Sequence, residues 1–332
     1  MTVDTESGSW FITFMGLAEG KDWQDVHNKV WALKSGDTRW QEKTPVPATL
    51  PLKGRLASIA VALNGKAWLF GGYTVAEDHS EISSPDNYSY DVLTDNYTKL
   101  KDMPVPVDDA VAVTYQNRYI YLISGWHNDG NVNLVQIYDT KTDSWQQGSP
   151  YPGAPVFGHA GGILDDQILV CDGVKVVPQR AKRRTFAPES ACYKGIINPS
   201  HINKIDWQIV AHPTGKSRYR MAAKGVKTPS LEGVLFIGGS DNPYNYNGVG
   251  YNGEPSEPDE MIWFYHFDEK RWQLLANDDP TMDHRGLLEY EAGFYIIAGM
   301  GKNQQVLNRI THFNKQQLLT TISENKNNLG QE

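Results

Sequence analysis

Short runs of apolar residues, each closed by glycine, recur along the chain. The clearest run covers residues 67–70, Ala-Trp-Leu-Phe, and ends in Gly71 and Gly72. Runs of the same kind occupy residues 119–123, 168–171, 234–237 and 294–297. A short apolar run between turn signals is typical of a buried strand and is too short for a stable helix. The pattern therefore predicts an all-β chain made from one repeated unit.

Each repeat predicts four short strands. In one repeat an innermost strand at 110–113 is followed by the apolar run at 119–123, a third strand at 136–139 and a fourth that begins at Trp145. One such sheet is too small to bury both of its faces, so consecutive sheets must pack against one another. Closing them into a ring leaves only short strand edges exposed. The prediction is an all-β, six-bladed propeller with four-stranded antiparallel blades.

The repeat resembles the Kelch repeat, which combines an apolar tetrad, a pair of glycines, a Tyr and a Trp. The resemblance is clearest over residues 68–97, 119–145 and 235–272, and it extends over nearly the whole chain. Some repeats depart from it: Tyr97 stands in place of the Trp, and Ser124 replaces the first glycine of one pair. The resemblance implies a Kelch-type β-propeller.

The two ends of the chain set the predicted boundaries. We expect the propeller to cover residues 1–322 and a polar, flexible tail to cover residues 323–332. The first repeat has no obvious innermost strand before Trp10, and the last has only residues 318–322 as a candidate fourth strand. We therefore expect one blade to be shared between the two termini, which would close the ring.

Charge and hydropathy exclude several classes of protein. The formal net charge is −8 and the pI is about 5.6, which argues against nonspecific binding to nucleic acid or to anionic membranes. No run is long and apolar enough to cross a bilayer. Residues 1–9 have neither the basic nor the apolar region of a signal peptide. We therefore expect a cytoplasmic protein, or a periplasmic one if a leader has been removed.

The two cysteines, Cys171 and Cys192, indicate neither a disulfide framework nor a metal site. No Cys or His pair has the spacing of zinc ligands, and the sequence predicts no metal and no cofactor. Cys171 lies on a predicted second strand, and Cys192 lies on the third strand of the same blade. We expect them to be buried neighbours that remain two free thiols.

Loop lengths predict which face of the propeller carries a site. Because strand direction alternates within a blade, the loops between second and third strands share a face with the entries to the innermost strands. Turns on the other face, such as Asn64-Gly65, are tight. The long loops cover residues 74–87, 126–133, 174–189 and 240–260. Trp126 and Tyr244 lie in two of them, and such aromatic rings beside asparagine amides suit a sugar.

Charged residues gather at the entries to the innermost strands, next to the channel axis. Asp109, His159, Arg220 and Arg285 occupy such positions, as does Arg55. Arginines that converge from different blades would bind an anionic ligand, most simply a carboxylate. In Kelch-like repeats, however, an Arg commonly opens this strand and a His can follow within it. Arg55 and His159 would then be scaffold residues that orient the loops.

Among Kelch propellers, the sequence resembles the sialic acid mutarotase (N-acetylneuraminate epimerase) family. The shared features are the blade number, the size and an enlarged fourth-blade loop with an Arg-Thr pair, here Arg184-Thr185. The resemblance implies that Arg184 is a functional residue and that the ligand is a small, carboxylated sugar. Arg184 and Arg220 would then hold the carboxylate.

One departure from the family pattern concerns the catalytic acid. Val174 follows Gly173 at the position where the family has a Glu. Opening and reclosing a sugar ring at its anomeric carbon needs a general base and a general acid close to the reacting oxygens. Glu189, His159 or Asp109 would have to supply these groups.

Two other functions fit the same fold. A non-catalytic module would bind a glycan or a protein partner through the loop face, as many Kelch propellers do. A copper radical oxidase of the galactose oxidase type ranks last, because it needs a Tyr–Cys crosslink and neither cysteine is predicted at the channel mouth. The leading interpretation is a carbohydrate-active propeller of the mutarotase kind.

Overall fold

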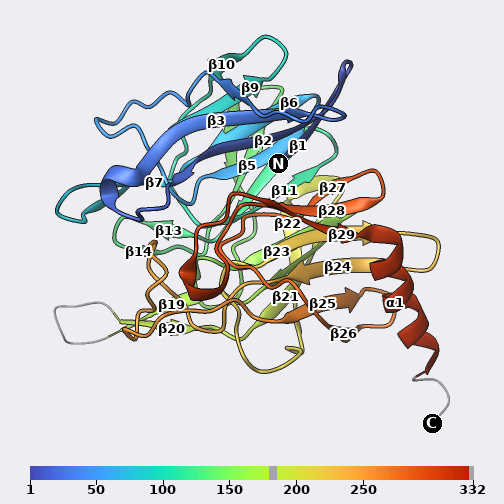
Figure 1. The fold of residues 1–332 in the computed structure, drawn as a ribbon. Helices are drawn as coiled ribbons and strands as arrows, with labels where there is room; N and C mark the ends of the chain where they lie inside the picture. The colour runs from blue at the N-terminus through green and yellow to red at the C-terminus, as the bar shows by residue number, and fades with distance from the viewer. Residues whose placement is uncertain (179–184, 329–332) are drawn as a thin grey trace.

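Six small antiparallel sheets surround a central channel, one sheet for each repeat (Figure 1). The structure is a computed structural model that describes residues 1–178 and 185–328, with side chains described as far as Glu324. Within these residues the first five blades have four strands and the last has three. In every blade the first strand along the chain lines the channel. The predicted six-bladed, all-β propeller is confirmed.

The strands of each blade follow one another outward from the channel. Blade 1 contains β1 (Thr2–Thr5), β2 (Gly8–Leu17), β3 (Val26–Lys34) and β4 (Gln41–Lys43). Blade 2 contains β5 (Ile59–Leu63), β6 (Lys66–Phe70), β9 (Asn87–Asp91) and β10 (Asn96–Lys99). Blade 3 contains β11 (Val111–Tyr115), β12 (Tyr119–Ile123), β15 (Val135–Asp139) and β16 (Ser144–Gln147).

The later blades repeat this order. Blade 4 contains β17 (Ala160–Leu164), β18 (Gln167–Cys171), β21 (Cys192–Asn198) and β22 (His201–Val210). Blade 5 contains β23 (Ala222–Lys227), β24 (Glu232–Ile237), β25 (Met261–His266) and β26 (Arg271–Ala276). Blade 6 contains β27 (Leu288–Tyr290), β28 (Gly293–Ile297) and β29 (Ile310–Asn314), followed by helix α1 (Lys315–Asn328).

The hydrophobic core lies between neighbouring blades. Ile123 and Ile137 of blade 3, for example, pack in one cluster with Ile168 and Val170 of blade 4. Each of these side chains is fully buried and contributes roughly 1.5–3 kcal/mol. The outermost strands are much more exposed, as in β16, where Gln147 faces solvent. Each apolar run therefore belongs to a second strand because that strand is covered on both faces.

The ring is closed without a shared blade, so that prediction is wrong. Residues Thr2–Thr5 form β1, the innermost strand that the sequence pattern does not reveal. Only Val3 of its four residues is buried, which leaves too short an apolar signal. Blades 1 and 6 meet through side chains: the ring of Phe11 packs edge-on against Tyr290 and Tyr295, with centroids 5.5 and 5.4 Å apart.

Helix α1 takes the place of the outermost strand in blade 6, so the predicted strand at 318–322 is wrong. Leu319 and Ile322, one helical turn apart, are buried against Phe294 and Ile296 of β28. The helix runs from Lys315 to Asn328 and so passes residue 323, where the flexible tail is predicted to begin. The domain boundary at residue 322 stays a prediction. No helix within the described ranges is both long and apolar enough to span a membrane.

A disulfide joins Cys171 to Cys192, so the expectation of two free thiols is wrong. The two residues are buried and directly opposed in the ladder between β18 and β21, as predicted. Their Cα atoms are 4.1 Å apart, which brings the two thiols within bonding reach. The crosslink holds the second and third strands of blade 4 together at the point where its long loop leaves the sheet.

Candidate functional site at the channel mouth

Additional hairpins extend the loops between second and third strands, on the side of the molecule that lies at the left in Figure 1. They are β7 (Tyr73–Val75) with β8 (Glu81–Ser83), β13 (Trp126–His127) with β14 (Gly130–Asn131), and β19 (Val174–Val177) with β20 (Thr185–Pro188). Short 3₁₀ turns lie in the corresponding loops of blades 1 and 6, η1 (Trp23–Asp25) and η2 (Lys302–Gln304). The blade 5 loop, residues 240–260, is held by isolated bridges instead of a hairpin. These segments form the loop face.

The entry to each innermost strand has the same backbone form in blades 2 to 6. Its last extended residue pairs with the residue that follows the glycine at the end of the second strand of the same blade, as Asp108 does with Trp126. The following residue has a positive φ, between 52° and 68°. These left-handed residues are Ala57, Asp109, Gly158, Arg220 and Asp283. The conformation costs a residue with a side chain roughly 1–2 kcal/mol, so the surrounding structure must hold it.

A belt of backbone hydrogen bonds supplies that support. The N–H of Asp109 donates to the carbonyl of Ala57, the N–H of Gly158 to that of Asp109, and the N–H of Arg220 to that of Gly158, at 3.1, 2.9 and 2.7 Å. A side chain at Gly158 would collide with the Tyr219 ring, since an added Cβ would lie 1.8 Å from it. The belt therefore fixes Asp109 and Arg220 at equivalent places around the loop-face end of the channel.

Arg220 lies between two carboxylates at this mouth. Its Nη2 is 2.5 Å from Oδ2 of Asp109, and its Nη1 is 2.9 Å from Oδ1 of Asp283. The Tyr219 hydroxyl donates to Asp109 at 3.2 Å, and the Arg285 guanidinium lies 3.4 Å from Asp109 and 3.6 Å from Asp283. We call these five residues the mouth cluster. Two arginines face two carboxylates, so the charges of the cluster balance.

Burial and pairing fix the protonation of the central pair. Burial raises the pKa of Asp109, but the charges of Arg220 and Arg285 outweigh it and leave this pKa below its ordinary value. Burial lowers the pKa of Arg220, and the attraction of Asp109 reverses that effect and raises the pKa well above its ordinary value. Both groups are therefore ionised at neutral pH.

Two further carboxyls lie close to the mouth cluster. Burial raises the pKa of Asp108 well above its ordinary value, and its Oδ2 accepts a hydrogen bond from the Ser83 hydroxyl at 2.8 Å. Desolvation by the surrounding loops also raises the pKa of Glu81 to about 7, with Arg220 opposing the shift. Glu81 keeps contact with solvent, so it is a carboxyl that a ligand could reach and that changes charge near neutral pH.

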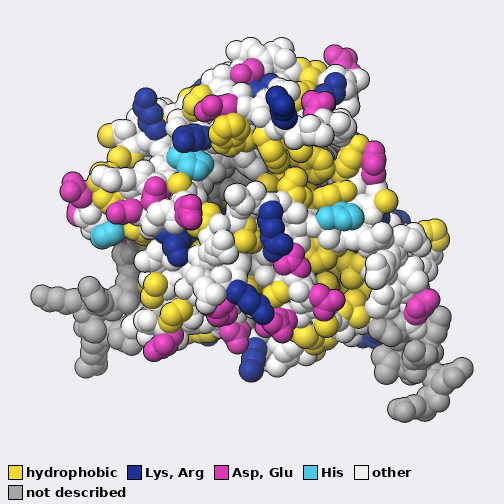
Figure 2. Space-filling model, viewed as in Figure 1, with side chains coloured by type: hydrophobic (Ala, Val, Ile, Leu, Met, Phe, Trp, Pro, Cys, Tyr) yellow, Lys and Arg dark blue, Asp and Glu magenta, His cyan; other side chains and the backbone are white. Residues whose placement is uncertain are grey.

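The channel beneath the mouth has a volume of about 450 Å³. Its walls are mostly small residues of the innermost strands, among them Ala60, Ala112 and Gly161. At the loop-face end it is lined by Asp109, His159, His284 and Arg285. Figure 2 shows a hollow in the viewed face between the N-terminal and C-terminal blades. A cavity of this size suits a small ligand of about one sugar ring.

The two histidines of the channel wall are held as neutral side chains. Nε2 of His159 is 2.8 Å from the carbonyl of Ile123, and Nε2 of His284 is 2.9 Å from the hydroxyl of Thr281. Burial lowers the pKa of each to about 4. His159 therefore ties blade 4 to blade 3, which is the scaffold role that the sequence left open.

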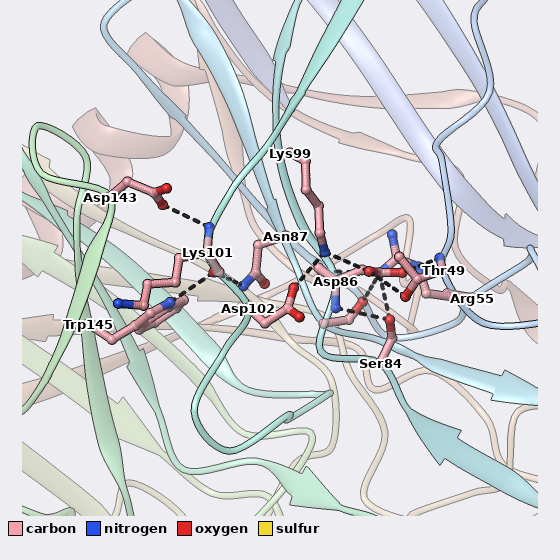
Figure 3. Close-up of polar contacts among 11 residues, drawn as sticks. Thr49, Arg55, Ser84, Asp86, Asn87, Lys99, Lys101, Asp102, Asp143 and Trp145 are labelled. Atoms are coloured by element: carbon pink, nitrogen blue, oxygen red, sulfur yellow. Dashed lines mark hydrogen bonds and ion pairs between the residues drawn. The ribbon is translucent and has the colours of Figure 1, made fainter.

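Arg55 also has a structural position. It is buried, and its Nη1 donates to the carbonyl of Gly71 at 2.8 Å and to the hydroxyl of Ser84 at 3.2 Å. Figure 3 shows Arg55 beside Ser84 and Asp86, whose carboxylate is bound instead by Thr49 and Lys99. Arg55 secures the two ends of the blade 2 loop and lies outside the residues that line the channel.

The remaining four predicted site residues have different positions. Tyr244 covers the mouth cluster, because its ring lies 5.4 Å from the Arg220 guanidinium. Trp126 packs edge-on against Phe157, at a centroid distance of 5.5 Å, in the apolar layer of the loop face. Glu189 is paired with Lys175 in the blade 4 hairpin. Arg184 lies outside the described residues.

The structure thus brings together Asp109, Arg220, Tyr244 and Arg285, with His159 in the adjoining wall. Sequence analysis missed Asp283, Tyr219 and Glu81. Asp283 had a usable signal, because it stands in the same position of its repeat as Asp109 and Arg220. Glu81 had none, since it lies within a long loop whose hairpin pairing is set by the fold.

Asp172, Cys192 and His212 are close enough to suggest a metal site, but their hydrogen bonds oppose it. The ligand atoms lie within 4.8 Å of one another. Nδ1 of His212 accepts the N–H of Gly215 at 2.8 Å, so the ring hydrogen is on Nε2 and points to Asp172 at 2.6 Å. A metal at Nε2 would displace that hydrogen while the other nitrogen still faces a donor. Both cysteines are joined in the disulfide, so neither can form the Tyr–Cys crosslink of a copper radical oxidase.

Comparison with known proteins identifies the repeat. Residues 110–150 match the model of the Kelch motif. Kelch-like protein 36 of Bos taurus is 25% identical over 49% of this chain and 25% of its own length. Kelch domain-containing protein 3 of Homo sapiens is 22% identical over 52% of this chain and 46% of its own length. Kelch-like protein terF of Aspergillus terreus is 27% identical over 40% of this chain and 30% of its own length. The matched region thus spans a quarter to somewhat less than half of these relatives.

A solved structure has the same architecture over nearly the whole chain. It is described as the structure of YjhT, and it superposes with a TM-score of 0.69 over 94% of this chain and 96% of its own, at 14% identity. A likeness at this identity concerns the fold alone. Together with the blade topology, the comparisons show that the chain is a six-bladed β-propeller with a Kelch motif at residues 110–150.

Proposed function

We propose that this protein is a carbohydrate-binding Kelch propeller that takes its ligand at the loop-face end of the channel. The mouth cluster is the observation that carries the proposal. Asp109, Arg220 and Asp283 form a fixed row of charged hydrogen-bonding groups, and Tyr219 and Tyr244 place aromatic rings against it. Polar groups in fixed positions beside apolar ring faces are what a polyhydroxylated ring with C–H faces requires.

The charge balance favours an uncharged sugar over a carboxylated one. Arg220 is fully engaged by Asp109 and Asp283, and Arg285 faces the same two carboxylates. A carboxylate ligand would compete with them for both guanidinium groups. The resemblance to sialic acid mutarotases assigns the carboxylate to Arg184 and Arg220, and Arg184 lies outside the described residues.

Mutarotation of the bound sugar is the second candidate function, and Glu81 favours it. A carboxyl whose pKa is about 7 can both accept and donate a proton at neutral pH. Glu81 is also exposed to solvent, and its pKa is lowered by the charge of Arg220 and raised by that of Asp109. It would take the acid/base role that the sequence analysis gave to Glu189, His159 or Asp109. An acidic sugar such as sialic acid stays within this candidate as one substrate.

NMR with freshly dissolved single anomers tests both functions. Saturation transfer from the protein to glucose, galactose or sialic acid reports binding, and the approach of the anomers to equilibrium reports catalysis. We expect binding of a neutral sugar that weakens at least tenfold in Arg285→Ala and is unchanged in Arg309→Ala, an exposed arginine paired with Asp279. Glu81→Gln should bind the sugar but lose any acceleration. If no sugar binds, the proposal fails.

A protein partner on the loop face is the alternative to a sugar. Its test is a pull-down with the loop face altered at Trp126 and Val249, both of which lie in loops of that face. Capture of a partner that depends on these residues, with no sugar binding, would favour the protein-binding module.

A further inference from the structure

The blade 5 loop reaches across the channel mouth and touches the opposite side of the ring. The hydroxyl of Tyr246 lies 3.0 Å from Nδ1 of His79, which stands in the turn between β7 and β8 of blade 2. Blades 2 and 5 face each other across a six-membered ring. The Tyr246 ring also packs against the apolar cluster of Leu56, Ala57 and Val75. The loop is therefore anchored at both sides of the mouth.

This loop covers the mouth cluster. Tyr244 is fully buried and packs edge-on against Tyr219, with ring centroids 5.0 Å apart. Tyr251 packs against Phe186 of the blade 4 hairpin at 4.4 Å. Tyr219 and Arg220 beneath them are almost completely buried, although the channel adjoins them. A ligand that enters from the loop face can reach Arg220 only if the loop moves.

The construction of the loop fits such a movement. Its backbone makes two short bridges of its own, Tyr244 with Gly250 and Val249 with Pro255, so it can move as one unit. Gly239, which has a positive φ, lies immediately before the loop. Opening would expose the rings of Tyr244 and Tyr251, which pack in the apolar cluster of the loop face, so the closed position is the stable one. Across the mouth, Tyr246 supplies its contact with blade 2.

The hydroxyl of Tyr244 indicates what the closed loop contacts. It is buried and has no hydrogen-bond partner among the described residues. A buried hydroxyl without a partner is unfavourable, and a ligand hydroxyl at the mouth would satisfy it. The Tyr244 ring lies 5.4 Å from the Arg220 guanidinium, which places this side chain at the mouth cluster.

We propose that the blade 5 loop is a lid that closes over the ligand, that Tyr246 latches it to blade 2 at His79, and that the Tyr244 hydroxyl binds the ligand. The part played by Tyr244 rests on the proposed sugar-binding function. The lid itself does not, because its opening can be measured without any sugar.

Chemical labelling of a thiol placed beneath the latch tests the lid. In an Ala57→Cys background, the introduced thiol would lie under Tyr246 and should react slowly with a maleimide. We expect labelling at least tenfold faster when Tyr246→Ala is added, and a smaller increase with His79→Ala. Tyr119→Ala, which removes a half-buried aromatic ring near the face opposite the loop face, controls for the loss of a ring. Equal labelling rates in all four proteins would overturn the lid.

The ligand arm uses Tyr244→Phe and the neutral sugar that binds best by NMR. We expect its affinity to fall about three- to tenfold, as for the loss of one neutral hydrogen bond, with no change in the labelling rate. Unchanged affinity would remove Tyr244 from the binding site. If the parent protein binds no sugar, the proposed function and the role of Tyr244 both fail, and the labelling rates still decide whether the loop is a lid.

Discussion

Replacing Asp109 with asparagine tests whether the mouth cluster is held by a buried ion pair. The change keeps the shape of the side chain but leaves the Arg220 guanidinium, 5% exposed, without its nearest counter-ion. Removing one partner of a buried pair costs about 3–5 kcal/mol, because the other charge stays buried. Asp283 remains 2.9 Å from Arg220, so we expect the lower end, about 3 kcal/mol.

Chemical and thermal denaturation measure this loss. At roughly 2 °C for each kcal/mol, the variant should melt about 6 °C below the parent, with an unchanged slope in urea. Asp279→Asn is the matched control, because its pair with Arg309 is about half exposed on both sides and should be worth less than about 1 kcal/mol. Asp109→Asn/Arg220→Met should recover much of the stability. If Asp109→Asn is no worse than Asp279→Asn, the electrostatic account of the mouth is wrong.

Three further predictions concern the scaffold. Burial lowers the pKa of His159 and His284 to about 4, whereas histidines of the unfolded chain have a pKa of about 6.5, so the unfolded chain binds more protons between these values and stability should fall as the pH is lowered from about 6.5 to 4. His284→Gln should make stability depend less on pH in this range, and an unchanged pH dependence would contradict the assignment of His284 as a buried neutral side chain. Reducing the Cys171–Cys192 disulfide should cost about 3 kcal/mol, measured as a lower Tm, and an intact mass without the loss of two hydrogens would show that the bond is absent. Leu319→Ala should cost about 2–3 kcal/mol in urea denaturation, whereas an effect below about 0.5 kcal/mol would mean that α1 does not cap blade 6.

The position of the site followed from the sequence only in part. Asp109, Arg220 and Arg285 could be placed near the axis because each stands at the entry to an innermost strand. Their partners could not be assigned, because an arginine at a strand entry looks the same in sequence whether it faces a ligand or a carboxylate. Asp283 turns two of these arginines into members of a balanced cluster, and Arg55 is directed to backbone carbonyls instead.

The amino-acid sequence by itself determined the fold class, the number of blades and the face that carries the long loops. These depend on local patterns, namely apolar runs of strand length and glycines at fixed positions, which repeat six times. Only the tertiary structure decided how the ring closes, since β1 and α1 carry weak or ambiguous local signals and gain their stability from neighbouring blades. It also decided that Tyr246 meets His79 across the mouth, because a contact between residues 167 positions apart has no local pattern and depends on where six blades place their loops.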